Sequence, residues 1–225
     1  PENIVASIIA VAEAGAGLLP LPAPTLGATG PLTLAGALAQ QLAEFLTTCV
    51  IAAATRPGTE VLFCSRVSGI DLRTAVASWG DPQVGMSGAC MVAIGRRLGL
   101  PVNCYGLSTA SSRLDPQLAY EKMLNALVPA MSGVDVLSGV GSMDNLIAGS
   151  PLLATIDDEM IGMVRYVLRG CPTDDESLAF DVMKRVILED GVFLSDAHTV
   201  QQMRKGAAWM PAVSERAGDS AGDPD

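Results

Sequence analysis

The chain has 225 residues, of which 49% are apolar, so it can bury a core and is not a disordered protein. Its formal net charge of −10, from 24 acidic and 14 basic residues with no basic cluster, argues against nucleic acid as a partner. Apolar stretches are interrupted before they reach the roughly 18 residues of a membrane-spanning helix, so we expect no such helix. No basic region precedes an apolar one at the start of the sequence, so we expect no export signal there.

The first predicted elements are a helix, a strand and a longer helix. Apolar residues recur with helical spacing over residues 2–14, and two glycines follow them. The short apolar run Leu18–Leu21 is typical of a strand. After a loop rich in Pro, Gly and Thr, residues 33–55 are predicted to form a helix that ends before a Pro-Gly pair.

The same alternation continues along the chain. Strands are predicted at 60–65, 100–107 and 134–140. Asp-Pro pairs at 81–82 and 115–116 each supply an N-cap and a proline at the first helical position, so two helices are predicted to begin there. The strands recur at intervals of about 40 residues, which is the rhythm of βα units.

Beyond residue 154 the pattern becomes helical. Apolar residues between 156 and 168 lie on one face of a predicted helix. Thr173 and Glu176 have the spacing of a capping box, which predicts the start of another helix. A third helix is predicted to begin at Ser195 or Asp196.

Four strands with long loops at their carboxyl ends fit two architectures, a doubly wound sheet and half of an eight-stranded β/α barrel. In both, ligands bind at the carboxyl ends of the strands. The long predicted loops 66–80, 108–114 and 141–154 all follow strands, whereas the connections at the opposite end are tight. We therefore expect the functional site on this rim.

Several features have both a chemical and a structural interpretation. The Gly27–Gly30 turn could bind an anion at the start of the following helix, or be a tight turn that lines a site. Lys122, Lys184 and Lys205 all fall in predicted helices, which argues against a Schiff-base mechanism on a barrel strand. The single histidine, His198, follows the strands and is interpreted as a surface or helix-end residue, and a Ser-His-Asp triad would depend on it alone.

Five widely spaced cysteines, odd in number, predict reduced thiols and a cytoplasmic protein. They are Cys49, Cys64, Cys90, Cys104 and Cys171. Cys64 and Cys104 occupy similar places late in neighbouring predicted strands, and thiolates bind zinc. Core packing is the alternative interpretation, because the sequence has no CxxC pair.

Three carboxylates and two aromatic residues fall on the predicted rim. Asp115 has the structural role of an N-cap, whereas Asp71 and Asp144 lie in loops where the sequence shows no such role. Trp79 and Tyr105 lie near the same rim in a chain with only 4% aromatic residues. A carboxylate beside an aromatic face can bind a quaternary ammonium ion, although each residue alone also has an ordinary structural interpretation.

Four segments, taken in order, resemble the C-terminal half of the trimethylamine methyltransferase family. They are LPLPAPTLGATGPLTLAGALAQQLAE, FCSRVSGIDLRTAVASWGDPQ, DPQLAYEKMLNAL and DDEMIGMVRYVLRG, and the resemblance extends over residues 1–205. It implies an α/β fold of the TIM-barrel type, (β/α)8, to which this chain supplies about four βα units plus C-terminal helices. The implied domains are 1–154, the C-terminal half of the barrel; 155–210, a helical segment; and 211–225, a disordered acidic tail.

Members of this family pass a methyl group from a methylated amine to the cob(I)alamin of a small corrinoid protein. Every residue here is an ordinary one, so the resemblance points to the branch without pyrrolysine, which includes enzymes that demethylate glycine betaine. It therefore implies a methyltransferase for a quaternary or tertiary amine, with a corrinoid protein as partner and no covalently bound cofactor. On this hypothesis we expect the substrate to face five residues of the rim, Asp71, Trp79, Tyr105, Ser108 and Asp144, and no catalytic residue is assigned.

Two other functions remain open. The chain could be a non-catalytic barrel fragment that binds a corrinoid protein, a second copy of itself or a separate chain that completes the barrel. It could also be a zinc-dependent methyltransferase that uses Cys64 and Cys104.

Overall fold

The computed structural model describes residues 2–189 and 191–215 and divides into two units, Pro1–Met160 and Ile161–Asp225. The boundary between them falls inside helix α5, Pro151–Leu168. Most of the tail predicted at 211–225 lies outside the described residues.

A three-stranded parallel sheet forms the centre of the first unit, in the order β1 (Phe63–Ser65), β4 (Val102–Tyr105) and β5 (Val136–Ser138). Leu18 forms an isolated parallel bridge with Val61, which places residue 18 beside the chain that leads into β1. The predicted strands therefore lie side by side in sequence order. The described residues contain this open sheet and no closed barrel.

Of the strand predicted at Leu18–Leu21, only Leu18 pairs with the neighbouring chain. The Leu18 N–H donates to Glu60 O, and Leu18 O accepts from the Leu62 N–H, both at 2.9 Å. In a parallel ladder the next bond to this side would come from the N–H of residue 20, which is a proline and has none. The prediction is therefore wrong in extent, although the run does lie at the edge of the sheet.

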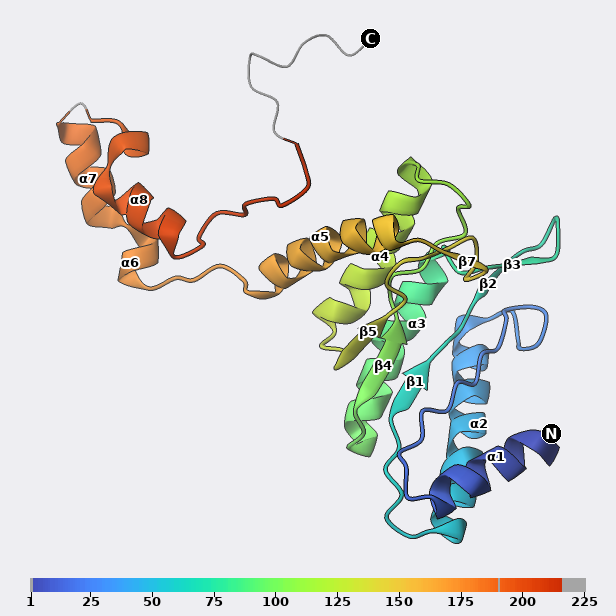
Figure 1. Ribbon diagram of the computed structural model, residues 1–225. Coiled ribbons are helices and arrows are strands. Elements are labelled where there is room, and N and C mark those ends of the chain that lie inside the picture. The colour runs from blue at the N-terminus through green and yellow to red at the C-terminus, as the bar shows by residue number, and fades with distance from the viewer. Residues whose placement is uncertain (1, 190, 216–225) are drawn as a thin grey trace. The chain divides into compact units, whose positions relative to one another are not determined.

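Helices α2 (Leu34–Thr55), α3 (Pro82–Leu98) and α4 (Pro116–Met131) lie along one face of this sheet, and α1 (Glu2–Glu13) packs on α2 (Figure 1). The apolar faces of α2 and α3 form one core with the strand side chains that point toward these helices. Its fully buried members include Ala37, Phe45, Phe63, Val67 and Met91.

Both predicted Asp-Pro helix starts are confirmed. Asp115 accepts a hydrogen bond from the Leu118 N–H at 2.9 Å and so caps α4 with its side chain. Asp81 occupies the N-cap of α3, but its carboxylate accepts from Ser78 Oγ at 2.7 Å and makes no cap bond. At the far end, Gly99 adopts φ 67° and ends α3, as its position after the helix predicts.

Helix α2 qualifies the expectation about membrane spans. Its 22 residues have a mean hydropathy of 1.4, so length and composition alone would let it cross a membrane. Ala37, Leu38 and Phe45 of this helix are buried in the core of the first unit. A helix that packs into a core passes the same test of composition, and α2 is the single helix that does so within the part of the chain described.

Two long loops contain short hairpins that the sequence did not indicate. Within 66–80, β2 (Gly69–Asp71) pairs antiparallel with β3 (Val76–Ser78). Within 141–154, β6 (Ser142–Met143) pairs with β7 (Ala148–Gly149), and α5 begins at Pro151. These strands are too short to show an alternating pattern.

The second unit contains the end of α5 and further short helices. They are α6 (Asp175–Leu178), α7 (Phe180–Leu188), η1 (Phe193–Ser195) and α8 (Ala197–Arg204). The capping box predicted at Thr173 is wrong, because Asp174 is the N-cap and accepts from the Ser177 N–H at 2.9 Å. The start predicted at Asp196 is confirmed, since Asp196 caps α8 through the His198 N–H.

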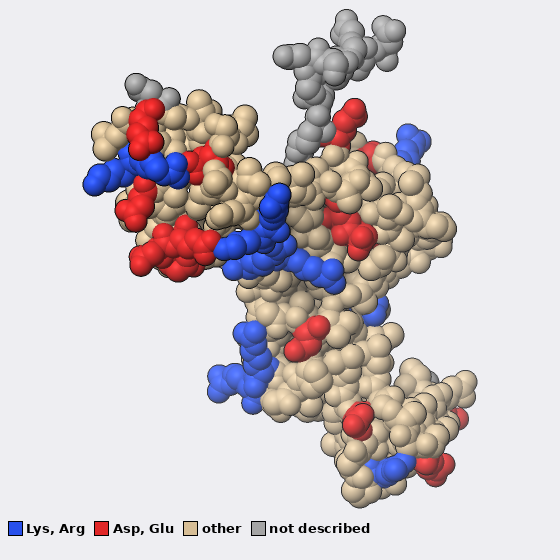
Figure 2. Space-filling model, turned by 60° about the vertical axis from the view of Figure 1, so that its left-hand side comes forward, with Lys and Arg blue, Asp and Glu red and all other residues tan. Residues whose placement is uncertain are grey.

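Charged side chains do not dominate the surface. On the face drawn in Figure 2, some acidic groups lie next to basic ones, and the others are scattered among uncharged residues. The net charge of −10 is therefore not gathered into one continuous acidic area on that face.

Candidate functional site

The sheet of the first unit has a polar face, made by Cys64, Asn103, Tyr105 and Ser138. Cys64 lies opposite Asn103, and Tyr105 lies opposite Ser138, in the register of the strands. Asn103 Oδ1 accepts hydrogen bonds from Cys64 Sγ at 3.0 Å and from Ser138 Oγ at 3.2 Å. Because side chains alternate along a strand, this face is opposite to the one that packs on the helices.

A cation and two aromatic rings meet at the carboxyl end of the polar face. The Arg66 guanidinium carbon lies 4.4 Å from the centroid of the Tyr105 ring. The Trp79 ring contacts Tyr105 edge-on, with 5.8 Å between centroids. Burial raises the pKa of the Tyr105 phenol, which therefore stays protonated at neutral pH. We call Arg66, Trp79 and Tyr105 the aromatic cluster.

Trp79 is held in the cluster by its backbone. Its N–H donates to Asn145 Oδ1 at 3.0 Å, and Asn125 Nδ2 donates to the carbonyl of the next residue, Gly80, at 3.2 Å. Asn145 lies in a left-handed turn, with φ angles of 53°, 51° and 73° at Asp144, Asn145 and Leu146. The turn thus presents Asn145 to Trp79, whereas Asp144 uses its N–H to bond Ser111 O at 2.8 Å.

Asp71 lies apart from the aromatic cluster, on the β2–β3 hairpin. It forms an ion pair with Arg73 at 3.0 Å, and hydrogen bonds from Arg73 lower the pKa of Asp71 to about 2. It lines a cavity of about 720 Å³ together with Gln117, Glu121 and Asn145. Of the predicted site residues, the structure therefore brings Trp79 and Tyr105 together and places Asp71 in a neighbouring cavity.

Ser108, also predicted for the site, is completely buried in the loop after β4. Its hydroxyl is enclosed and has no hydrogen-bond partner among the residues the structure describes. The next residue, Thr109, donates to Glu121 Oε2 at 2.6 Å, and the Ala110 N–H donates to the same oxygen at 2.8 Å. Glu121 therefore fixes the rim loop that contains Ser108 onto α4.

Glu121 also packs against a glycine of the neighbouring rim loop. A Cβ atom on Gly80 would lie 2.1 Å from Glu121 Oε2 and 2.2 Å from its carboxyl carbon. Glu121 cannot withdraw without losing its bonds to Thr109 and Ala110. The close approach of these two rim loops thus requires glycine at position 80.

We expect Gly80→Ala to lower the free energy of unfolding by about 1–3 kcal/mol, because the methyl group overlaps a carboxylate that can move only by losing its hydrogen bonds to Thr109 and Ala110. Urea unfolding followed by circular dichroism measures the change. Gly17→Ala is the matched control, since its Cβ would lie 3.8 Å from Glu60, an ordinary contact. Equal stability of the two variants would show that Glu121 yields without cost.

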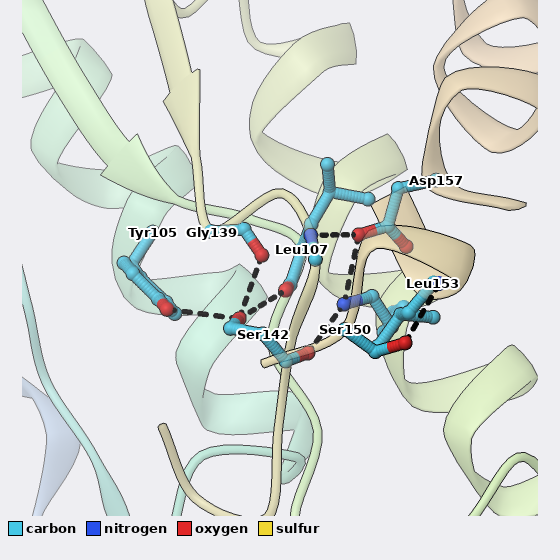
Figure 3. Close-up of polar contacts among 9 residues, drawn as sticks. Tyr105, Leu107, Gly139, Ser142, Ser150, Leu153 and Asp157 are labelled. Atoms are coloured by element: carbon cyan, nitrogen blue, oxygen red, sulfur yellow. Dashed lines mark hydrogen bonds and ion pairs between the residues drawn. The ribbon is translucent and has the colours of Figure 1, made fainter. Parts of the chain in front are cut away.

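A buried ion pair lies behind the rim. Lys122 Nζ and Asp157 Oδ2 are 3.0 Å apart, and both side chains are fully buried. Burial lowers the pKa of Lys122 and raises the pKa of Asp157. Lys122 Nζ also donates to Ser142 O at 2.6 Å, and Asp157 accepts from the Gly141 N–H at 2.6 Å (Figure 3). Lys122 lies in α4, as predicted, and its amine is engaged by these contacts.

The zinc site considered for Cys64 and Cys104 does not fit the structure. Cys64 lies on the polar face, whereas Cys104 belongs to the core on the helix side and donates weakly to Gly88 O at 3.6 Å. Their strand positions differ by one residue, which puts the two thiols on opposite faces of the sheet. Within the described ranges, no group of three His, Cys, Asp or Glu residues has the arrangement of a metal site.

We expect thiol reagents to separate the cysteines by burial. Cys90 and Cys171 are exposed and should react quickly in the folded chain. Cys64 and Cys104 are buried, and burial raises the pKa of the Cys104 thiol to about 12, so both should react only after unfolding. Mass spectrometry after brief labelling measures this, with a Cys90→Ser/Cys171→Ser variant as the control. Label on Cys104 in the folded chain would contradict the structure.

The Gly27–Gly30 turn is structural. The N–H groups of Ala28, Thr29 and Gly30 all point to Thr25 O at 3.1 Å, and the Gly27 N–H donates to Gly30 O. These donors are used within the turn, so the interpretation as a tight turn is favoured over an anion site.

Two residues of this rim were missed by the sequence analysis. Arg66 directly follows a predicted strand, and a cation at the carboxyl end of a strand is a signal that could have identified it. Asn145 gave no such signal, because only the left-handed turn directs it toward Trp79.

Comparisons with known proteins agree with the resemblance. The family model for trimethylamine methyltransferase (MTTB) matches residues 2–220. The chain is 31% identical over 216 residues to a glycine betaine methyltransferase of Desulfitobacterium hafniense, covering 96% of this chain and 45% of that protein. It is 31% identical over 160 residues to the trimethylamine methyltransferase MttB of Methanosarcina barkeri, covering 71% of this chain and 32% of that protein. A trimethylamine methyltransferase MttB from another Desulfitobacterium hafniense strain is 32% identical over 197 residues, which are 88% of this chain and 40% of that protein. The chain thus spans less than half the length of these relatives.

Proposed function

We propose, since the chain belongs to the trimethylamine methyltransferase family, that it takes part in methyl transfer from a carboxylated quaternary amine to the cob(I)alamin of a separate corrinoid protein. One relative is named a glycine betaine methyltransferase and others trimethylamine methyltransferases. The corrinoid is here a methyl acceptor carried by the partner, and the amine is the methyl donor.

The aromatic cluster is the observation that carries the choice of substrate. Arg66 covers one face of the Tyr105 ring, so the Trp79 ring and the remaining surface of Tyr105 are the parts that attract a trimethylammonium group, and Arg66 offers a planar donor for a carboxylate. Arg66 forms no ion pair with an Asp or Glu in the described part of the chain. A betaine carries both complementary groups, whereas trimethylamine has no carboxylate for Arg66.

For this reaction the site must orient the methyl donor and need not transfer a proton. When the methyl group leaves a quaternary nitrogen, the C–N bonding pair stays on nitrogen and a neutral tertiary amine is released, while cob(I)alamin supplies the electron pair of the new bond. No proton moves. The protonated phenol of Tyr105 and the permanent charge of Arg66 suit a site that holds the donor in line.

We also propose that the first unit is part of a β/α barrel. The sequence order of its strands supports this architecture over a doubly wound sheet, in which the strand order reverses at the binding crevice. The proposal keeps residues 1–154 as the barrel half, 155–210 as a helical segment and 211–225 as an acidic tail. It places the protein in the cytoplasm, in agreement with five free cysteines.

The test is the visible spectrum of cob(I)alamin mixed with the purified chain and glycine betaine, choline or trimethylamine. Formation of methylcob(III)alamin with glycine betaine supports the proposal. No change, with circular dichroism showing a folded chain, would mean that this chain alone does not catalyse the transfer.

A second function, a binding partner that completes a barrel, is favoured by one observation. An apolar groove of about 820 Å³ lies along the open edge of the sheet, between α1, residues 18–23 and α2. Further strands from a longer chain, a second copy or another protein would cover it. Sedimentation decides between these states, since a stable and strictly monomeric chain would contradict a barrel completed by a separate chain or a second copy.

A further inference from the structure

The phenol end of Tyr105 is enclosed by the turn between β5 and β6. The Tyr105 hydroxyl donates to Ser142 Oγ at 3.0 Å, and Ser142 Oγ in turn donates to Gly139 O at 2.6 Å. Gly139 has φ 107°, and a Cβ atom there would lie 3.0 Å from Cζ of the Tyr105 ring. The turn at 139–142 therefore touches the ring directly and orients its hydroxyl.

The same turn is held from its other side by the buried ion pair. Figure 3 shows Ser142 between Tyr105 on one side and Asp157 on the other. Lys122, from α4, donates to the Ser142 carbonyl, and Asp157, from α5, accepts from the Gly141 N–H, each at 2.6 Å. Two helices thus fix the backbone of the turn through one acceptor and one donor.

An apolar pair could fill the space of Lys122 and Asp157, but it could not bond the turn. Gly141 adopts φ 75°, and the strand that follows has only two residues, so the sheet pairs few of these backbone groups. Buried backbone donors and acceptors need partners. Asp157 Oδ1 is itself buried without a hydrogen bond in the described part of the chain. The buried ion pair therefore costs more free energy of desolvation than an apolar pair in the same place would.

We propose that Lys122 and Asp157 are positioning residues for the substrate site: they hold the 139–142 turn, and the turn holds the Tyr105 ring in the aromatic cluster. The proposal rests on the proposed function only in taking Tyr105 as a substrate contact. Neither Lys122 nor Asp157 touches the substrate in this scheme.

The experiment reads the position of Tyr105 without any substrate. Trp79 and Trp209 are the only tryptophans, so in a Trp209→Phe background the emission reports Trp79, whose ring contacts Tyr105. Ser142→Ala removes the bond to the phenol and should shift the emission, and Ser142→Thr, which keeps the hydroxyl, should restore it. Lys122→Met and the pair Lys122→Met/Asp157→Leu should give the shift of Ser142→Ala, because both release the turn that bonds the Tyr105 hydroxyl.

Gln41→Met is the matched control, because it removes a buried side-chain hydrogen bond to Pro22 O away from the turn. An unchanged emission in this control, with shifted emission in the folded double variant, supports the proposal. Parent-like emission in the double variant overturns it, as does an equal shift in the control. If Lys122→Met alone does not fold, the double variant decides. None of these measurements depends on methyl transfer. The positioning role of Lys122 and Asp157 can therefore be disproved while the methyltransferase function stands, and the methyltransferase function can be disproved while the positioning role stands.

Discussion

Replacing Arg66 with methionine is expected to weaken the binding of glycine betaine about 10- to 100-fold and to leave the binding of tetramethylammonium nearly unchanged. The guanidinium lies over the Tyr105 ring and has no acidic partner in the described part of the chain, so it is available to a carboxylate. A charge-assisted hydrogen bond contributes about 1.5–3 kcal/mol, which sets the size of the effect. Isothermal titration calorimetry with both ligands measures it.

Two control variants make the result specific. Arg97→Met removes an arginine from the last turn of α3, away from the aromatic cluster, and should leave both affinities unchanged. Arg66→Lys keeps the charge but loses the planar group that stacks on Tyr105, and should recover only part of the loss. An equal loss for betaine and tetramethylammonium in Arg66→Met would mean that Arg66 supports the ring and does not bind a carboxylate.

Breaking the buried ion pair from one side is expected to lower the free energy of unfolding of the first unit by about 3–5 kcal/mol. Asp157→Leu leaves the fully buried Lys122 without its anion. Lys122→Met/Asp157→Leu removes both charges and should recover part of the stability, since apolar pairs of similar volume often replace buried ion pairs without loss, while the Gly141 N–H and the Ser142 carbonyl still lose their partners. Urea unfolding followed through Trp79, in a Trp209→Phe background, reports this unit.

The pH dependence of Asp157→Leu gives a second check. Burial already lowers the pKa of Lys122 in the native chain, and the loss of Asp157 removes the contact that raises it. A group with a lowered folded pKa adds stability above its unfolded pKa and loses it as the pH falls through the folded pKa. The deficit of Asp157→Leu should therefore shrink as the pH rises toward about 10. A deficit that grows in this range would contradict the assignment of the cost to a buried ammonium ion.

The parts of the fold that follow from local chemistry were predictable from the sequence. Proline at the first helical position after Asp81 and Asp115, and glycine where α3 ends, act within a few residues of where they stand. The hairpin β2–β3 was not predictable, because three-residue strands depend on their partner rather than on their own pattern. The cap predicted at Thr173 is wrong because the N-cap is the next residue, Asp174.

The site was predictable in part. Trp79 and Tyr105 were placed on one rim, and the structure brings their rings into contact, while their role in binding stays a prediction. Cys64 and Cys104 show why the direction of a side chain could not be predicted from the sequence. Both come late in a strand, but their positions in the paired strands differ by one residue, so they lie on opposite faces of the sheet. The Lys122–Asp157 pair joins helices 35 positions apart in sequence, so no local pattern marks it.

The alternating prolines at the sheet edge act before the chain folds. Residues 20, 22 and 24 are prolines with a fixed φ, and residues 19, 21 and 23 each precede a proline and so avoid the helical region. All six positions of this segment are thus biased toward extended backbone in the unfolded ensemble. The segment loses little conformational entropy when it settles beside β1, and a single rung at Leu18 with a bridge at Thr25 is enough to secure it.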